Sequence, residues 1–110
     1  MKNLYIIGYG LAGGYGGIHD YEIIKAESFI DAELYAWQKA CDYYEMYIDG
    51  TNLRSVECIM EEEDLDEEAA YVIFDDERES WLEYVTIQYN EENMKKIEGY
   101  NVYNPYKKLK

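Results

Sequence analysis

The chain has few basic residues, one proline, one histidine, two cysteines and no long apolar segment. Its 110 residues hold ten Lys and Arg against 24 Asp and Glu, which gives a formal net charge of −14. No apolar run approaches the roughly 18 residues of a membrane helix, and no signal-peptide pattern opens the chain. The length suits one hydrophobic core, and 48% hydrophobic residues argue against disorder. We expect a single cytoplasmic domain with no membrane segment.

The cysteines and the histidine give little support for catalysis. Cys41 and Cys58 lie at unrelated positions, which favours reduced, buried thiols over a disulfide scaffold. His19 could act as a base on a nucleophile such as Cys41 if the fold brings the two together. Cys41, however, falls in the apolar stripe of a predicted helix, where an inert thiol is expected. The acidic run 61–68 lacks the turning glycine of a calcium loop. We therefore expect no catalytic residue, no metal site and no cofactor.

Almost all of the excess negative charge lies in one stretch. Residues 61–92 hold 14 of the acids and one base, Arg78, whereas residues 93–110 hold five lysines and one acid, Glu98. Such a field repels DNA, RNA and anionic membranes and attracts cationic surfaces. We therefore do not expect the chain to bind nucleic acid directly. We expect its partner to be a basic surface of another protein.

The N-terminal segment is typical of a hairpin. Residues 3–9 and 21–26 are aromatic and β-branched and predict two strands around the glycine-dense segment 10–17. Residues 8–13 match the GxGxxG dinucleotide fingerprint, but that motif needs a helix at its glycine turn. Too few residues separate Gly13 from the next strand for a parallel crossover. We expect a hairpin loop, with Gly13, Gly14, Tyr15 and Gly16 as residues that can contact a partner or small ligand.

Three helices are predicted after the hairpin. Ser28 is a candidate N-cap with Asp31 three residues later, and the helix that follows is expected to end at Asp49-Gly50. A second helix is expected over 55–62, and either Asp64 or Asp66 caps a third. The expected inward stripe of the first helix is Ile30, Leu34, Trp37, Cys41, Tyr44 and Ile48, with Tyr35, Lys39, Tyr43 and Met46 on the opposite side.

The third helix is expected to reach Tyr84, with Glu77 as the one acid on its apolar face, paired with Arg54 or a lysine. Residues 85–89 alternate as a third strand, and 100–103 can form a short edge strand. The predicted fold is α+β, a small antiparallel sheet covered by two or three helices. Residues 1–92 are expected to form the domain and residues 93–110 a basic, tyrosine-bearing tail.

The acidic stretch has two interpretations. Charge runs are commonly a solvated face, but 32 helical residues would span about 48 Å and carry net charge at nearly the axial spacing of one DNA strand. Concentrated like charge lowers folded stability, which suggests that the acids have a use. The expected partner-binding residues are Glu61, Glu62, Glu63, Asp64, Asp66, Glu67, Glu68, Tyr71, Asp75, Asp76, Glu79 and Glu83.

Two resemblances bear on function. The glycine-rich hairpin YIIGYGLAGGYGG, the Tyr/Trp helix ELYAWQKACDYYEMY and the closing ERESWLEY together resemble small uncharacterised bacteriophage proteins over about residues 3–89. By size, charge and lack of catalytic residues the chain is also similar to phage inhibitors of host defence that mimic nucleic acid, including inhibitors of restriction enzymes, uracil-DNA glycosylase and CRISPR effectors. This second likeness is of class, and it carries over no site residue.

The expected function is a non-enzymatic, anti-CRISPR-like inhibitor whose acidic face occupies a basic nucleic-acid-binding surface of a host complex. One alternative is a module that sequesters a small ligand or nucleotide with the glycine-rich loop. Another is a structural phage protein that forms homo-oligomers through the Tyr/Met side of the first helix.

Overall fold

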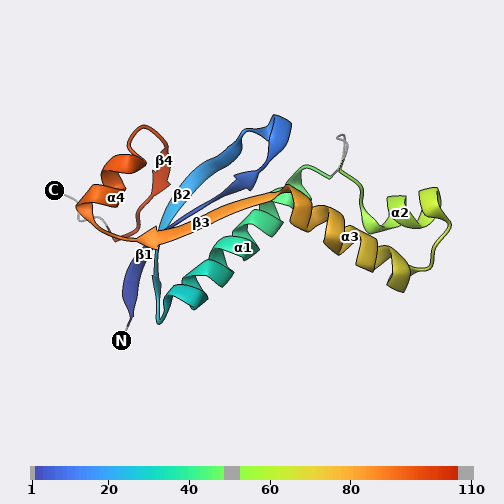
Figure 1. Cartoon of the computed structure of the whole chain (residues 1–110), viewed down its shortest axis with the longest axis horizontal. Helices are drawn as coiled ribbons and strands as arrows, with labels where there is room; N and C mark the ends of the chain where they lie inside the picture. The colour runs from blue at the N-terminus through green and yellow to red at the C-terminus, as the bar shows by residue number, and fades with distance from the viewer. Residues whose placement is uncertain (1, 49–52, 107–110) are drawn as a thin grey trace.

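The computed structural model describes residues 2–48 and 53–106 of the chain. The expected helix end at Asp49-Gly50 and the last three lysines lie outside these residues. The elements are β1 (Asn3–Leu11), a 3₁₀ turn (Gly13–Tyr15), β2 (Gly17–Ala26), α1 (Phe29–Met46), α2 (Val56–Glu63), α3 (Glu67–Trp81), β3 (Leu82–Gln88), α4 (Glu91–Lys96) and β4 (Asn101–Tyr103). The molecule is elongated, with extents of 56 × 30 × 21 Å (Figure 1).

The four strands form one sheet in the order β3-β1-β2-β4. β1 pairs antiparallel with both β2 and β3, and the short β4 runs parallel to β2. The predicted α+β class, the N-terminal hairpin and a third strand are confirmed, with β4 making the sheet mixed. Among the described residues, no helix combines the length and the apolar character needed to cross a membrane.

The hairpin is longer, and its loop shorter, than the sequence predicts. A bulge between Tyr9 and Gly10 lets Gly10 pair with Ile18 and leaves His19 as the extra residue. A Cβ at Gly10 would lie 2.0 Å from the carbonyl oxygen of Gly17, so only glycine allows this approach of the two strands. Only the three-residue 3₁₀ turn Gly13–Tyr15 begins at the end of the motif, and β2 follows it without an α-helix, so the dinucleotide motif is a hairpin turn.

The predicted inward stripe of α1 is wrong at Ile30 and Leu34. Its other members are buried or pack partly buried against the core, as predicted: Trp37, Cys41, Tyr44 and Ile48. The buried residues are Ala32, Ala36, Ala40 and Tyr44, whereas Ile30 is 73% and Leu34 55% exposed. The sheet already supplies bulky side chains at this interface, including Tyr5, Ile7 and Ile24. A helix that presents alanines can therefore approach the sheet closely, and its larger residues are left on the flank.

Among the residues that the structure describes, the second face of the sheet is covered only at one end. Ile6 and Ile23 pack there against Ile97, which follows α4 and is 3% exposed. The domain boundary expected at residue 92 falls inside α4, and the predicted edge strand at 100–103 is present as β4. The segment after residue 92 thus contributes both a strand and a buried side chain to the sheet.

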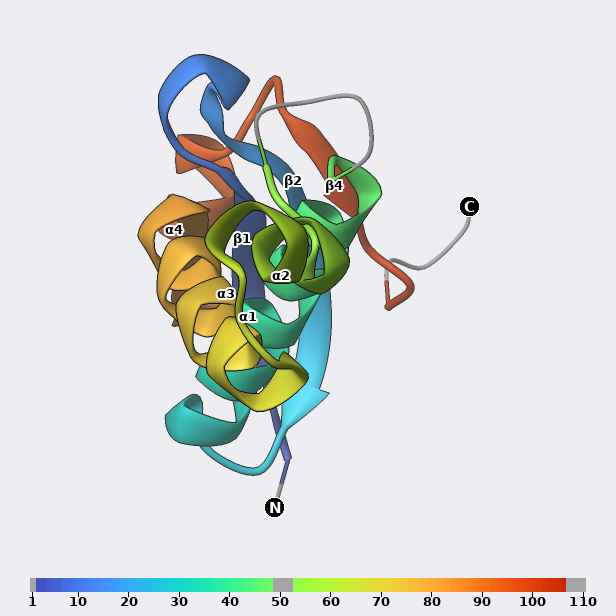
Figure 2. The same ribbon diagram turned by 90° about the vertical axis from the view of Figure 1, so that its right-hand side faces the viewer.

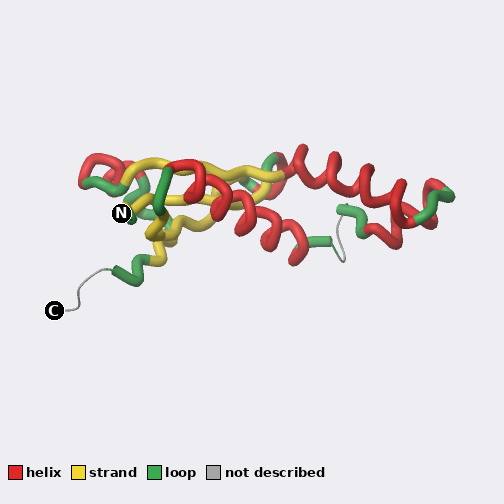
Figure 3. The backbone as a smooth tube through the Cα atoms, turned by 90° about the horizontal axis from the view of Figure 1, so that it is seen from below, coloured by secondary structure: helices red, strands yellow, loops and turns green. Residues whose placement is uncertain are grey.

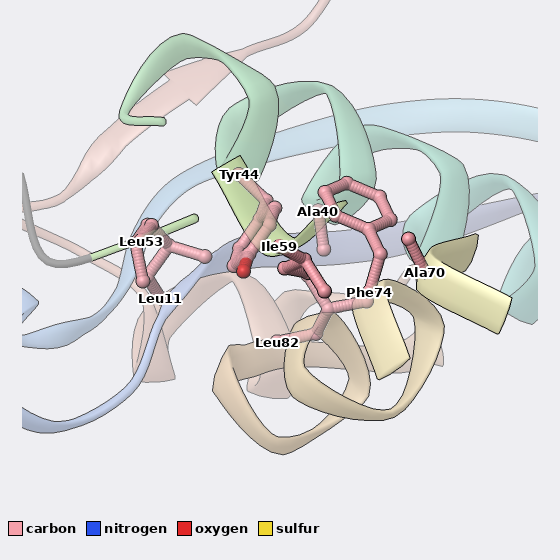
Figure 4. Packing of buried hydrophobic residues seen from close by; sticks show 8 residues of the cluster. All are labelled: Leu11, Ala40, Tyr44, Leu53, Ile59, Ala70, Phe74 and Leu82. Atoms are coloured by element: carbon pink, nitrogen blue, oxygen red, sulfur yellow. The ribbon is translucent and has the colours of Figure 1, made fainter. Parts of the chain in front are cut away.

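A separate cluster joins the sheet to the helices α2 and α3. Leu11 from β1 and Leu82 from β3 meet Tyr44 from α1, Ile59 from α2 and Phe74 from α3 (Figure 4). The Tyr44 and Phe74 rings meet edge to face at 5.9 Å. Burying these side chains holds the two helices at the end of the sheet.

Candidate protein-binding surface

Helices α2 and α3 form a hairpin that extends beyond the end of the sheet. Ser55 caps α2, Asp64 ends it in a left-handed conformation with φ 52°, and Asp66 caps α3 by accepting a hydrogen bond from the Ala69 amide at 2.9 Å. α3 leads directly into β3 and continues its line away from the sheet (Figures 1 and 3). Seen along the long axis, the hairpin lies in front of α1 (Figure 2). The acids of the hairpin therefore stand at one end of the molecule.

Arg54 offsets part of the charge of three acids on the two helices of this hairpin. Its guanidinium contacts both carboxylate oxygens of Glu77, lies 2.9 Å from Glu63 Oε2 and lies 3.6 Å from Glu62 Oε1. Glu77 was predicted to pair with Arg54 or a lysine, and the structure shows Arg54 as the partner. These three acids link the segment before α2 to both helices, so their main role is to hold the hairpin together.

Arg78 offsets two further acids of the predicted site. Its guanidinium lies 3.3 Å from Asp75 Oδ1 and 3.9 Å from Glu79 Oε1, and it stacks over the Trp37 ring at 5.4 Å. Glu79 also accepts a hydrogen bond from Trp37 Nε1 at 2.7 Å, which ties α3 to α1. Asp75 and Glu79 are exposed but already engaged within the fold.

The other hairpin acids of the predicted site are exposed and form no ion pair with a described cation. Asp66 has the N-cap role, and the rest contribute no hydrogen bond that the fold requires. We call this set the acidic hairpin surface, and it consists of Glu61, Asp64, Asp66, Glu67, Glu68 and Asp76.

Residues 61–92 do not reach the roughly 48 Å that 32 helical residues would span, because they are divided among α2, α3, β3 and α4. Glu83 lies in β3, while Glu91 and Glu92 lie in α4 at the opposite end of the molecule from the hairpin (Figure 1). From Glu68 to Glu79, α3 rises only about 16 Å. The structure therefore concentrates the negative charge on a compact projection and does not extend it as a long row.

Tyr71 lies in a groove where three helices meet. The residue is 49% exposed, and the groove is also lined by Glu45 of α1, by Ile48 beyond the end of that helix, and by Val56 and Glu57 of α2. The sequence prediction included Tyr71 but missed Glu45 and Glu57. They come from separate helices, and no spacing along the chain shows that they flank one tyrosine.

The glycine-rich loop is packed at its centre. The Tyr15 ring meets those of Tyr47 at 5.4 Å and Trp81 at 5.6 Å, and His19 Nε2 contacts the Tyr15 carbonyl oxygen. Gly13, Gly14 and Gly16 remain exposed beside it. Since Tyr15 is engaged in packing, the loop offers less to a ligand than the sequence suggests.

The surroundings of both thiols favour their neutral form. Burial raises the pKa of Cys41 to about 11, and the nearby Glu79 carboxylate acts in the same direction. Cys58 Sγ lies 2.7 Å from Glu62 Oε2, and this hydrogen bond raises the pKa of the Cys58 thiol. Within residues 2–48 and 53–106, no three His, Cys, Asp or Glu side chains are grouped so that they could hold a metal ion.

The chain matches no protein-family model, no curated protein and no solved structure. Its function is therefore inferred from its own side chains. Among these, the acidic hairpin surface stands out, because it gathers like charges that the fold does not pair.

Proposed function

We propose that this chain is a non-enzymatic inhibitor that occupies a cationic nucleic-acid-binding surface of a host defence protein or complex, as phage nucleic-acid mimics do. The observation that carries the proposal is the acidic hairpin surface, a set of exposed carboxylates without described counter-ions on a projecting pair of helices. Their mutual repulsion lowers the stability of the fold. A cationic partner turns the same repulsion into attraction.

The mechanism is competitive occlusion. Like charges gathered on a projection steer a basic partner toward the hairpin and raise the association rate. Carboxylates on one helix face stand about 5–6 Å apart at Cβ, so they can meet a row of Lys and Arg side chains placed for phosphates. Tyr71, flanked by Glu45 and Glu57, supplies an aromatic face for an inserted cation.

Neutralising part of the acidic hairpin surface tests the proposal. The triple variant Glu67→Gln, Glu68→Gln, Asp76→Asn removes three exposed carboxylates that form no described ion pair. The control Glu91→Gln, Glu92→Gln, Glu98→Gln removes the same charge from the opposite end of the molecule, and it too alters the first turn of a helix. The two variants therefore match in net charge and in effect on helix termini.

The assay is capture of proteins from a bacterial lysate on the immobilised chain, followed by mass spectrometry. We expect the unaltered chain and the control to retain nucleic-acid-binding proteins at low salt and to lose them at about 0.5 M NaCl, where the Debye length is under about 5 Å. Sheared DNA should compete, and the triple variant should retain much less. A partner that the triple variant holds equally well, or that binds alongside saturating DNA, would contradict the proposal.

A further inference from the structure

The outer edge of β3 is open. β3 is the end strand of the sheet, and no described residue pairs with the side that faces away from β1. Proteins protect such an edge with proline, lysine, a bulge or a very short strand. β3, with the sequence LEYVTIQ, has seven residues, no proline, no lysine and no register shift against β1, and its one charged residue is Glu83. β4, the strand at the other edge, has only three residues.

An exposed apolar flank of α1 runs beside this edge. α1 lies over β1 and β3 and contacts β2 much less. Trp37 of α1 donates a hydrogen bond to Glu79 of α3, close to the start of β3. Lys39, on the other flank of α1, forms an ion pair with Glu22 of β2. The Trp37 flank of α1 is therefore the one beside β3. On the helical wheel, Ile30 and Leu34 share the Trp37 side. With Tyr84 of β3, which is 38% exposed, they leave apolar surface next to unpaired backbone.

A second copy of the chain fits this edge in one register with full overlap. If the two-fold axis is perpendicular to the sheet, the same face of both copies lies on the same side of the joined sheet. The β3 residue through which the axis passes then pairs with the same residue of the other copy. With Val85 on the axis, Tyr84 of one copy faces Thr86 of the other, and Glu83 faces Ile87. No charged residue opposes another, and aromatic and β-branched pairs of this kind stabilise antiparallel strands.

The same axis brings the two α1 helices to packing distance. Because α1 lies over β1 and β3, its axis stands about one strand spacing, roughly 4.8 Å, from the two-fold axis. The two copies of α1 would then lie about 9–10 Å apart on one face of a continuous sheet, which is the usual distance of packed helices. Ile30 and Leu34 would be buried between them.

Each copy has a net charge of −14. Burial raises the pKa of Tyr84, and Glu33 of α1 lies close enough to raise it further. Two copies therefore repel one another near the axis, and the pairing needs screening by salt. The two Glu83 residues would stand four residues apart along the strand, about 13 Å, which exceeds the Debye length at about 0.15 M salt. The hairpins leave β3 at opposite ends of the dimer because the two strands are antiparallel (Figure 1). The acidic hairpin surfaces therefore stay apart and remain accessible.

We propose that two chains form a symmetric dimer through β3, with Val85 on the two-fold axis and the Ile30/Leu34 flanks of α1 packed across it. In the continuous sheet, the unpaired backbone groups of β3 form hydrogen bonds with the other copy. The contact between the two α1 helices buries the exposed Ile30 and Leu34. This interface is separate from the acidic hairpin surface, so either proposal can fail alone.

Disulfide trapping tests the register. Val85→Cys places two thiols at directly opposed positions, where Cα atoms lie about 4.5–5.5 Å apart, within disulfide range. Ile87→Cys is the matched control, because its own copy lies about 13 Å away. We expect copper-phenanthroline to cross-link the first variant and not the second, above a baseline set by the unsubstituted chain with Cys41 and Cys58. Equal cross-linking of both variants, or of neither, would overturn the register.

Light scattering tests the helix contact. We expect a mass of twice 13.1 kDa, with the dimer fraction rising between about 0.05 and 0.5 M NaCl as repulsion is screened. Ile30→Glu should give monomers, whereas Met46→Glu should leave the dimer intact, since both side chains are 73% exposed but lie on opposite flanks of α1. Loss of the dimer with Met46→Glu alone would overturn the proposal. So would a chain that is monomeric at high salt, which would leave the edge for a strand of another protein.

Discussion

Replacing Lys39 should expose how the fold tolerates a carboxylate beneath α1. Glu22 of β2 is only 8% exposed. Lys39 Nζ lies 3.6 Å from Glu22 Oε1, and the Tyr9 hydroxyl donates to the same oxygen at 3.3 Å. Burial, followed by the charge of Glu22, raises the pKa of Tyr9, so the phenol stays a neutral donor. Lys39→Met leaves the buried carboxylate with no cation beside it.

The stability lost in Lys39→Met should lie between the values for breaking an exposed and a buried ion pair. Exposed pairs contribute at most about 1 kcal/mol, whereas removing one partner of a buried pair costs about 3–5 kcal/mol. The Lys39 side chain is 34% exposed, and solvent screens part of the loss. We therefore expect the free energy of unfolding to fall by about 2 kcal/mol, or Tm by roughly 10 °C.

A double-mutant cycle measures this effect. Lys39→Met, Glu22→Gln and the double variant are compared by urea and thermal unfolding at one chain concentration, with exposed Lys95→Met as the control for the change in net charge. The double variant should recover most of the stability lost in Lys39→Met, because its amide no longer needs a cation. Strictly additive losses, or a Lys39→Met effect no larger than that of the control, would refute the reasoning.

Two further predictions concern the hairpin and the thiols. Gly10→Ala should abolish cooperative unfolding seen by circular dichroism, because the new Cβ would lie 2.0 Å from the Gly17 carbonyl oxygen. Gly14→Ala is the control, because its Cβ meets open space, and it should change the free energy of unfolding by less than about 0.5 kcal/mol. Similar effects at both sites would contradict the bulge. For Cys41, whose pKa is raised from 9.0 to about 11, the neutral thiol is favoured in the fold, so its contribution to stability is complete below pH 9 and is lost as pH rises through 11. Cys41→Ala should flatten alkaline unfolding over that range, and an unchanged profile would show that burial does not control this thiol.

Features encoded by neighbouring residues were predictable from the sequence. Ser28 Oγ accepts from the Asp31 amide at 3.1 Å, and Asp66 caps α3, because a short polar side chain needs only the next turn to act. That Glu77 needs a cation was also predictable, since it was the only acid on the apolar face of its helix. The choice of Arg54 over a lysine was not, because the two residues lie 23 positions apart in the sequence. The predictable features depend on local geometry and on the cost of burying a charge.

Features that depend on distant segments were not predictable. α3 ends at Trp81, three residues before the predicted end, because the Ala12 amide of the hairpin loop binds the Trp81 carbonyl at 2.8 Å and Leu82 is buried in the joint with β1. The alanine face of α1 escaped the periodicity argument because the sheet determines how large the facing residues can be. The early end of α3 divides the acidic stretch between a helix and a strand, and the alanine face of α1 leaves Ile30 and Leu34 exposed.

The acidic hairpin surface and the edge of β3 should respond to salt in opposite directions. A cationic partner binds the hairpin most strongly when the Debye length is long, whereas pairing of two chains of net charge −14 gains from screening. If capture of a host protein falls with salt while the mass of the chain rises, the hairpin is the partner site and β3 the dimer site. If both fall together, one charged contact produces both, and the separate roles of α3 and β3 are wrong.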